Sequence, residues 1–133
     1  MTASTHTVTV ERHLPYPQEK VWRALTEGPL IEQWLMKNDF QPAVDHAFKF
    51  TADWGSVDCQ VLTIDPPKTL AYSWSAYGLD TVVTFTLDPT ATGTLLRMEQ
   101  SGFRSNQDAA YNGATYGWQA FLGNLDRVVA ELP

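Results

Sequence analysis

The clearest pattern in the sequence is a helical spacing of large apolar side chains near the end of the chain. Over residues 106–132 they recur at steps of three and four, with a threonine filling one step, so they share one face of a helix. A helix of this length measures about 40 Å and can cross a small domain. The predicted face is formed by Tyr111, Thr115, Trp118, Leu122, Leu125, Val129 and Leu132.

Earlier in the chain, apolar and polar residues alternate with the period of two that is typical of half-buried strands. Val8 and Val10 alternate with polar residues over 6–14, and Pro15 ends this first strand because proline cannot donate to a ladder. Further strands are predicted at 47–51, 55–65, 69–75, 81–88 and 94–101, separated by residues with turn chemistry. Such short connections favour antiparallel hairpins.

Two short helical patterns lie between the first strand and the others. Residues 18–26 place Val21, Trp22 and Leu25 at helical spacing, and the Gly28-Pro29 pair ends that segment. A second helix is predicted at about residues 30–36. The expected architecture is therefore α+β, with a six-stranded antiparallel sheet, two short helices after the first strand and a long C-terminal helix.

Composition and charge narrow the class of protein. A chain of 133 residues fits one domain, which we expect to span residues 6–133 after a disordered tail at 1–5. The net charge is -6 and the nine Lys and Arg are scattered singly, which disfavours nucleic-acid binding. No run approaches the roughly 18 apolar residues of a membrane span, and the first residues lack the apolar region of a signal peptide. The lone Cys59 fits a reducing compartment, so we expect a cytoplasmic protein without membrane insertion.

Several segments together resemble a known superfamily. They are residues 17–34 (PQEKVWRALTEGPLIEQW), Gly55 with Val57, residues 64–74 (IDPPKTLAYSW), 81–89 (TVVTFTLDP) and 93–103 (GTLLRMEQSGF), then Gly117-Trp118 with Leu122 and Leu125. The series resembles the START-like (SRPBCC) superfamily, and more narrowly bacterial proteins similar to the C-terminal domain of the heat-shock-protein-90 ATPase activator. The resemblance covers residues 8–132. It implies a helix-grip fold, in which a curved antiparallel sheet wraps the C-terminal helix and leaves a cavity, but it does not fix the function.

No motif for metal or covalent chemistry is apparent. His6, His13 and His46 are far apart in the sequence, and none has a second ligand at metal spacing, so we expect surface histidines and no metal or cofactor. Cys59 alternates with Val57 and is expected to point inward as a small apolar residue, since nothing near it in the sequence would lower its pKa.

Three carboxylates are candidates for a catalytic role. Asp53, Asp58 or Glu99 could face a pocket as a general acid or base, although a solvated carboxylate is the commoner state. Arg97 lies on the opposite parity to Met98 and is expected to face solvent. No carboxylate has a paired partner, so we assign no catalytic residue.

Aromatic residues on the predicted inward positions carry the strongest functional signal. Core packing explains many of them, but Tyr and Trp also bring polar tips that need partners when buried. An apolar pocket with a few polar groups is the usual makeup of a small-molecule site. We expect the pocket to be lined by Trp34, Phe48, Phe50, Trp54, Tyr72, Trp74, Phe85, Met98, Tyr111, Trp118 and Leu122.

Three glycines inside the predicted long helix need an explanation. Gly113, Gly117 and Gly123 each cost about 1 kcal/mol relative to alanine in a helix interior. They allow either close contact with the sheet, which is the commoner use of glycine, or space for a ligand beside Trp118.

Three functions are weighed on this basis. The leading hypothesis is binding of a hydrophobic or aromatic small molecule between the sheet and the C-terminal helix. The alternatives are an enzyme on the same scaffold, such as a polyketide cyclase, aromatase or hydrolase, and a chaperone-regulating interaction module. A homodimer is left open, and a chaperone partner is the weakest of these expectations.

Overall fold

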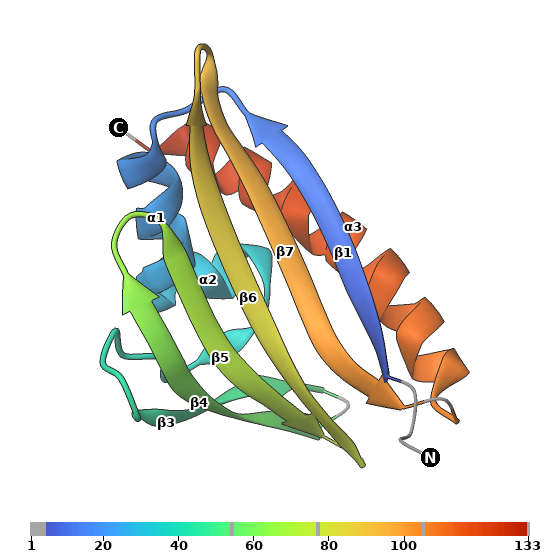
Figure 1. Ribbon diagram of the computed structural model, residues 1–133. Helices are drawn as coiled ribbons and strands as arrows, with labels where there is room; N and C mark the ends of the chain where they lie inside the picture. Colours follow the sequence, from blue (N-terminus) through green and yellow to red (C-terminus); the bar gives the residue numbers. More distant parts are fainter. Residues whose placement is uncertain (1–4, 54, 77, 105, 133) are drawn as a thin grey trace.

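In the part of the chain that the structure describes, one strand, two helices, six further strands and one long helix follow one another, which is the order expected from the sequence with one additional strand (Figure 1). A computed structural model describes residues 5–53, 55–76, 78–104 and 106–132. The predicted tail falls almost wholly outside these residues and stays a prediction. The helices are α1 (Gln18–Thr26), α2 (Gly28–Trp34) and α3 (Asp108–Glu131). The strands are β1 (Thr5–Leu14), β2 (Lys37–Asn38), β3 (Ala47–Ala52), β4 (Gly55–Asp65), β5 (Thr69–Ala76), β6 (Leu79–Thr90) and β7 (Gly93–Arg104).

The strands make one seven-stranded antiparallel sheet in the order β1-β7-β6-β5-β4-β3-β2. The sequence predicted six strands, and the additional one is β2. It pairs with β3 at Lys37↔Thr51 and Asn38↔Phe50. Two residues are too few to show an alternating pattern, which is why the sequence did not reveal this strand.

The β6–β7 hairpin extends further than the predicted break at residues 89–93. Pro89 stays in register with Thr94, and the paired ends are Thr90 and Gly93. Pro89 is tolerated because β5 begins at Thr69, opposite Thr86, so no β5 partner needs the missing N–H. A Cβ on Gly93 would stand 2.2 Å from the Leu14 carbonyl oxygen, so close packing under the hairpin requires glycine.

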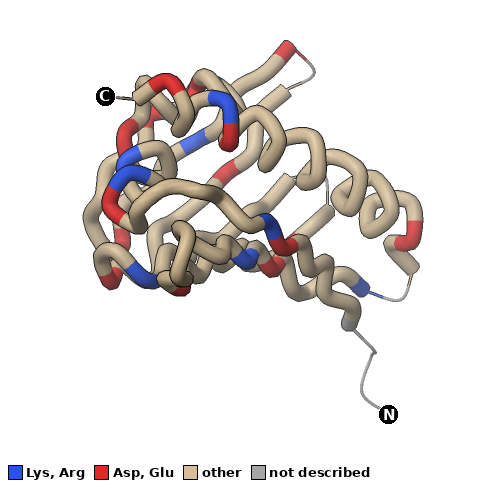
Figure 2. The backbone as a smooth tube through the Cα atoms, turned by 90° about the horizontal axis from the view of Figure 1, so that it is seen from above, with Lys and Arg blue, Asp and Glu red and all other residues tan. Residues whose placement is uncertain are grey.

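Helix α3 lies across one face of the sheet and carries charged residues only near its two ends (Figure 2). Its backbone lies against β1 and β7 and against α1 and α2, which close one end of the sheet. Within the described residues, no other strand comes as close to the α3 backbone. The inner faces of β3 to β6 are therefore reached from the helix through side chains.

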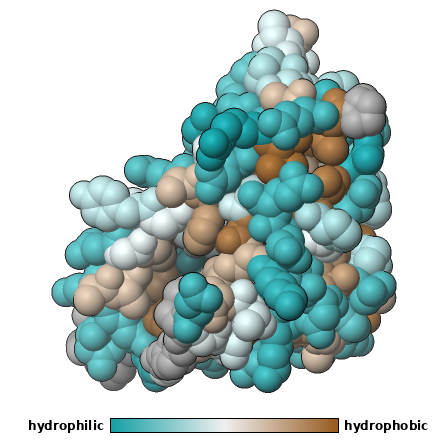
Figure 3. Space-filling model, turned by 180° about the vertical axis from the view of Figure 1, so that it is seen from behind, coloured by the Kyte–Doolittle hydropathy of each residue, from teal (hydrophilic) through white to brown (hydrophobic). Residues whose placement is uncertain are grey.

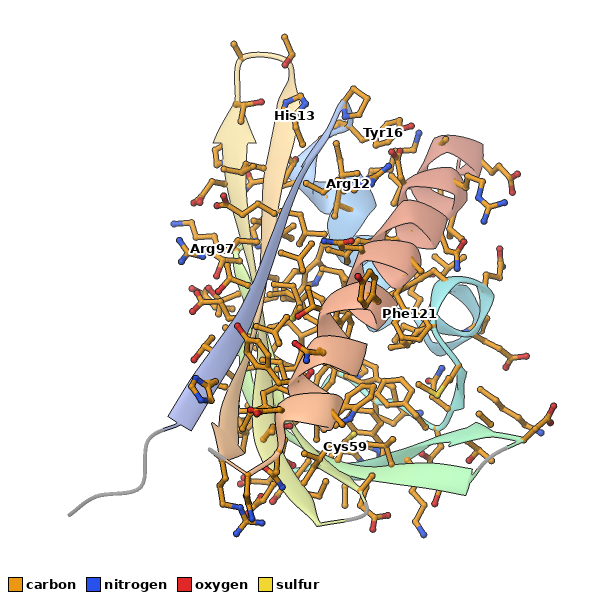
Figure 4. The ribbon with its side chains drawn as sticks, turned by 90° about the vertical axis from the view of Figure 1, so that its right-hand side faces the viewer. Arg12, His13, Tyr16, Cys59, Arg97 and Phe121 are labelled. Atoms are coloured by element: carbon orange, nitrogen blue, oxygen red, sulfur yellow. The ribbon has the colours of Figure 1, made fainter. Side chains whose placement is uncertain are left out.

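A polar contact anchors the C-terminal part of α3 to the start of the chain. Arg12 Nη2 lies 3.1 Å from Asp126 Oδ2, and the Tyr16 hydroxyl donates to Asp126 Oδ1 at 3.3 Å. Both side chains reach toward α3, whereas Arg97 projects from the opposite face of the sheet (Figure 4). Arg97 is exposed, as its parity predicted. None of the described helices is long and apolar enough to cross a membrane.

Candidate functional site

Aromatic side chains cover the inner face of the sheet at the positions that strand parity predicted. Phe48 lies 5.3 Å from Tyr72, and Phe50 lies 5.3 Å from Trp74, measured between ring centroids. Tyr72 continues the cluster to Phe85 at 6.0 Å. These five side chains are at most 9% exposed, so they form one buried aromatic surface.

Trp118 joins this surface to α3. Its ring lies 5.4 Å from Trp74 and 5.9 Å from Phe85. Only 2% of its surface is exposed, and Leu122, one turn further along, is fully buried. The side chains thus contact one another across the space between helix and sheet, and a ligand entering that space has to move some of them.

The burial of the inward residues of α3 differs between the two halves of the helix. From Trp118 to Val129 the residues of the predicted inward face are buried, as Leu125 and Val129 are, whereas Leu132 at its end is half-buried. Before Trp118, Tyr111 and Ala114 are only half-buried. Tyr111 packs on Phe103 and His6, with ring distances of 5.8 and 5.6 Å. The face seen in Figure 3 is mostly hydrophilic, and hydrophobic side chains reach its surface mainly in the middle and at the upper right. The N-terminal half of the helix is therefore the less closely packed part of the interface.

A chain of hydrogen bonds crosses the apolar interior beneath Trp118. The Trp118 Nε1–H donates to Gln100 Oε1 at 2.7 Å. Gln100 Nε2 donates to Thr81 Oγ1 at 3.0 Å, and the Thr81 hydroxyl donates to the Trp74 carbonyl oxygen at 2.9 Å. Among the described residues, every buried side-chain nitrogen and oxygen has at least one hydrogen-bond partner. Each of these polar groups therefore has a hydrogen-bond partner within the protein, as burial demands.

Most of the expected pocket residues come together in one hydrophobic cluster. Tyr111 lies at its half-buried margin, and Trp54 is outside the described residues. Trp34 has a structural part in the fold, since its Nε1–H donates to the Ala24 carbonyl oxygen at 2.8 Å and ties α2 to α1. The expected residues buried in the cluster are Trp34, Phe48, Phe50, Tyr72, Trp74, Phe85, Met98, Trp118 and Leu122.

Three buried residues of this region were not expected from the sequence: Gln100, Thr81 and Phe40. Gln100 shares the inward parity of Met98, and that alternation could have identified it, but a polar residue is normally assigned to the solvent side. Phe40 is 4% exposed and meets Phe48 at 5.1 Å from a connection between strands, where no periodicity exists to reveal it.

The candidate acid–base residues lie away from the interior. Asp53 is exposed, and the Asp58 side chain is 70% exposed beside Lys49 at 3.5 Å. Glu99 pairs with Arg97 at 3.2 Å on the outer face of the sheet. No charged side chain is buried within the described ranges, so the interior offers no carboxylate for general acid–base chemistry.

Among the described residues, the two buried groups that could ionise are held in their neutral forms. Burial raises the pKa of the Cys59 thiol, and the nearby charges of Asp58 and Asp39 raise it further. Burial also raises the pKa of Tyr72 well above its usual value, with a smaller contribution from Cys59. Cys59 is buried as a small apolar residue, as its alternation with Val57 predicted.

The histidines stay apart at the surface. His13 Nε2 lies 3.0 Å from Thr90 Oγ1, and His46 stacks on Phe48 at 6.4 Å. His6 is exposed beside Tyr111. The described residues contain no group of three or more His, Cys, Asp or Glu side chains that could hold a metal ion.

The glycines of α3 do not serve close contact with the sheet. A Cβ added to Gly113 or Gly123 would meet no atom within 4 Å, and one on Gly117 would meet the Phe121 ring at 3.8 Å. The commoner of the two expected uses of glycine is therefore wrong here, because no atom of the described strands lies within 4 Å of the added Cβ at these positions.

Open hollows also occur on the surface. One of about 560 Å³ lies between the start of α2 and residues 38–42, and another of about 430 Å³ lies between α2 and the C-terminal half of α3. The second is lined mainly by polar residues, including Gln33, Arg127 and Glu131. Neither has the aromatic lining found beneath α3.

Comparisons with known proteins place the chain in a family. A family model described as "Activator of Hsp90 ATPase homolog 1-like protein" matches residues 15–130. The crystal structure of protein MLL2253 from Mesorhizobium loti is 54% identical, with a TM-score of 0.92, covering 96% of this chain and 99% of that chain. The solution structure of Bacillus halodurans protein BH1534 is 25% identical, with a TM-score of 0.84, covering 97% of this chain and 99% of that chain.

A more distant match shares the fold. DynU16, described as a putative protein in the dynemicin biosynthetic locus, is 24% identical with a TM-score of 0.86 over 94% of this chain and 47% of its own. No curated protein matches this sequence. The chain belongs to the Activator of Hsp90 ATPase homolog 1-like family and has the helix-grip fold that its sequence resemblance implied.

Proposed function

We propose that the protein binds a hydrophobic or aromatic small molecule between the inner face of the sheet and the N-terminal half of α3. The observation that carries the proposal is the change in burial along the helix. Its inward face is buried from Trp118 to Val129 but half-buried at Tyr111 and Ala114. This less closely packed half lies next to a continuous aromatic surface, and sites for apolar ligands are built from such surfaces.

The chemistry of the interior favours a neutral ligand. The buried polar residues of the described part are Thr81, Thr94 and Gln100, and none of them carries a charge. Transferring a charged group from water into such an interior is costly unless a counter-charge is present. A neutral aromatic molecule loses little hydration and gains contacts with the rings of Trp74 and Trp118.

Access to the interior is expected through movement of the helix. Gly113 and Gly117 lie in the half-buried part of α3, and glycine lowers the cost of opening a helix because it has a weak helix propensity. Displacement of this half exposes the inner face of β5 and β6 while Arg12 and Asp126 hold the other end.

The other two functions have weaker support. An enzyme needs a group that donates or accepts protons in the pocket, and the described interior offers only protonated Cys59 and Tyr72. A chaperone partner is suggested by the family name alone. Measuring the ATPase rate of a purified Hsp90 with and without the protein tests that expectation.

The proposal is tested by titrating the protein with N-phenyl-1-naphthylamine, a neutral dye that fluoresces in apolar surroundings. We expect one dye per chain, with quenching of tryptophan fluorescence. Ala114→Trp places a large ring one turn before Trp118 on the inward face and is expected to abolish binding. Ala120→Trp adds the same ring at an exposed position of the same helix and serves as the control.

Circular dichroism establishes that both variants keep the fold. Dye binding that is unchanged in a folded Ala114→Trp protein, or that is lost equally in both variants, contradicts the proposed place of the ligand.

A further inference from the structure

We infer that Gln100 orients the bound molecule and selects one that carries a hydrogen-bond acceptor, such as a ketone or quinone oxygen, on an apolar ring system. This inference rests on the proposed function and names the ligand class of the same site. The inference comes from the buried side-chain amide of Gln100. Its orientation is fixed by its hydrogen-bond partners, and one of its two N–H groups has no acceptor among the described residues.

The direction of each hydrogen bond around Gln100 follows from its partners. The indole nitrogen of Trp118 can only donate, so the atom 2.7 Å away must be the amide oxygen of Gln100. The amide nitrogen therefore faces Thr81 at 3.0 Å. Because the Thr81 hydroxyl gives its hydrogen to the Trp74 carbonyl oxygen, it must accept from Gln100.

One hydrogen of the amide is left over. A glutamine amide nitrogen carries two hydrogens, and the first goes to Thr81. For the second, no acceptor is found among the described residues. Gln100 is 2% exposed, so bulk water does not reach the group freely, and a buried donor without an acceptor is unfavourable. A ligand atom that accepts this hydrogen would relieve that cost.

The position of Gln100 places this donor beside the expected ligand. Its neighbours on the adjoining strands are Val83 on β6 and Val8 on β1, both buried and apolar. Trp118 lies above it, at the point where the inward face of α3 turns from buried to half-buried. An acceptor that reaches this point meets a single donor in apolar surroundings, where a hydrogen bond is stronger than in water.

The competing explanation is that Gln100 serves only to satisfy the Trp118 indole. Thr94 shows what a purely structural group looks like on the same strand. It is fully buried, and its single hydroxyl hydrogen goes to the Tyr16 carbonyl oxygen at 2.8 Å, so no donor is left over. Thr94 therefore provides a matched control for the loss of a buried hydrogen bond.

The experiment compares two ligands of almost the same shape, fluorene and 9-fluorenone, which differ by one carbonyl oxygen. Their dissociation constants are measured by tryptophan quenching for the wild type, Gln100→Leu, Gln100→Glu and Thr94→Val. The quantity compared is the ratio of the two constants, because differences in ligand hydration cancel between proteins. Gln100→Glu keeps an acceptor for Trp118 but lacks the second donor, so it replaces the leucine variant should that variant fail to fold.

We expect the preference for 9-fluorenone over fluorene to fall about 2- to 10-fold in both Gln100 variants, as for one neutral hydrogen bond. It should be unchanged in Thr94→Val. An equal ratio in wild type and folded Gln100 variants overturns the inference and leaves the proposed function standing. Failure of both ligands to bind the wild type overturns the proposed function and the inference with it.

Discussion

Replacing Trp118 with alanine is the sharpest test of how the helix and the sheet are held together. Trp118 is 2% exposed and contacts the rings of Trp74, Phe85 and Phe121 at centroid distances of 5.4, 5.9 and 5.7 Å. Deleting a buried ring of this size costs about 3–5 kcal/mol. The change also removes the donor to Gln100 Oε1, and leaving a buried polar atom unpaired costs about 1–3 kcal/mol. We therefore expect a loss in the upper part of the first range, about 4–5 kcal/mol.

The loss is measured by equilibrium unfolding in urea, followed by circular dichroism. The control is Tyr116→Ala, because Tyr116 is on the same helix but 78% exposed, and a surface substitution should change stability by less than about 0.5 kcal/mol. A loss below about 1 kcal/mol for Trp118→Ala would mean that the ring is not packed as described.

A milder substitution separates the ring from its hydrogen bond. Trp118→Phe keeps an aromatic ring but cannot donate to Gln100, so we expect a smaller loss of about 1–3 kcal/mol. In the double variant with Gln100→Leu the unpaired amide is gone, and part of that loss should be recovered. Losses that simply add would show that the two side chains are not coupled.

Three other predictions follow from described contacts. Gly113→Ala should raise the free energy of unfolding by about 0.5–1 kcal/mol, measured by urea unfolding, because a Cβ there meets no atom within 4 Å. Unfolded cysteine ionises near pH 8.5 whereas the pKa of native Cys59 is raised, so stability should fall as pH increases above about 8.5. The part of this loss of stability that comes from Cys59 ionisation should be absent in Cys59→Ala, as measured by urea unfolding at several pH values. Arg12→Ala should cost less than about 1 kcal/mol in thermal unfolding, because its bond to Asp126 is partly exposed, and a larger loss would assign the contact a greater part in holding α3.

The inner face of the sheet could be predicted because alternation in a strand is strict. Phe48 and Phe50, like Tyr72 and Trp74, are two residues apart and therefore share a face, which burial on one side confirms. The long helix could be predicted equally well, because seven residues expected to face inward recur at the spacing of a helix. Tyr111, at the start of that face, is only half-buried, which periodicity alone does not distinguish.

The polar part of the site could not be predicted in the same way. Gln100 and Trp118 are eighteen residues apart and meet only when α3 crosses β7, so no local pattern links them. The surroundings of the α3 glycines also depend on the tertiary structure, because the sequence does not say which atoms face them. Trp34 was expected to line the pocket, but its indole N–H donates a hydrogen bond to a backbone carbonyl oxygen of α1.

Binding of a neutral aromatic molecule beneath the N-terminal half of α3 can be located by hydrogen–deuterium exchange with and without saturating 9-fluorenone. Ligand binding stabilises the segments that must open to release it. We expect slower exchange in residues 108–117 and in the facing parts of β5 to β7. Protection confined to the surface hollow around residues 26–42, or no protection at a concentration that saturates tryptophan quenching, would contradict it.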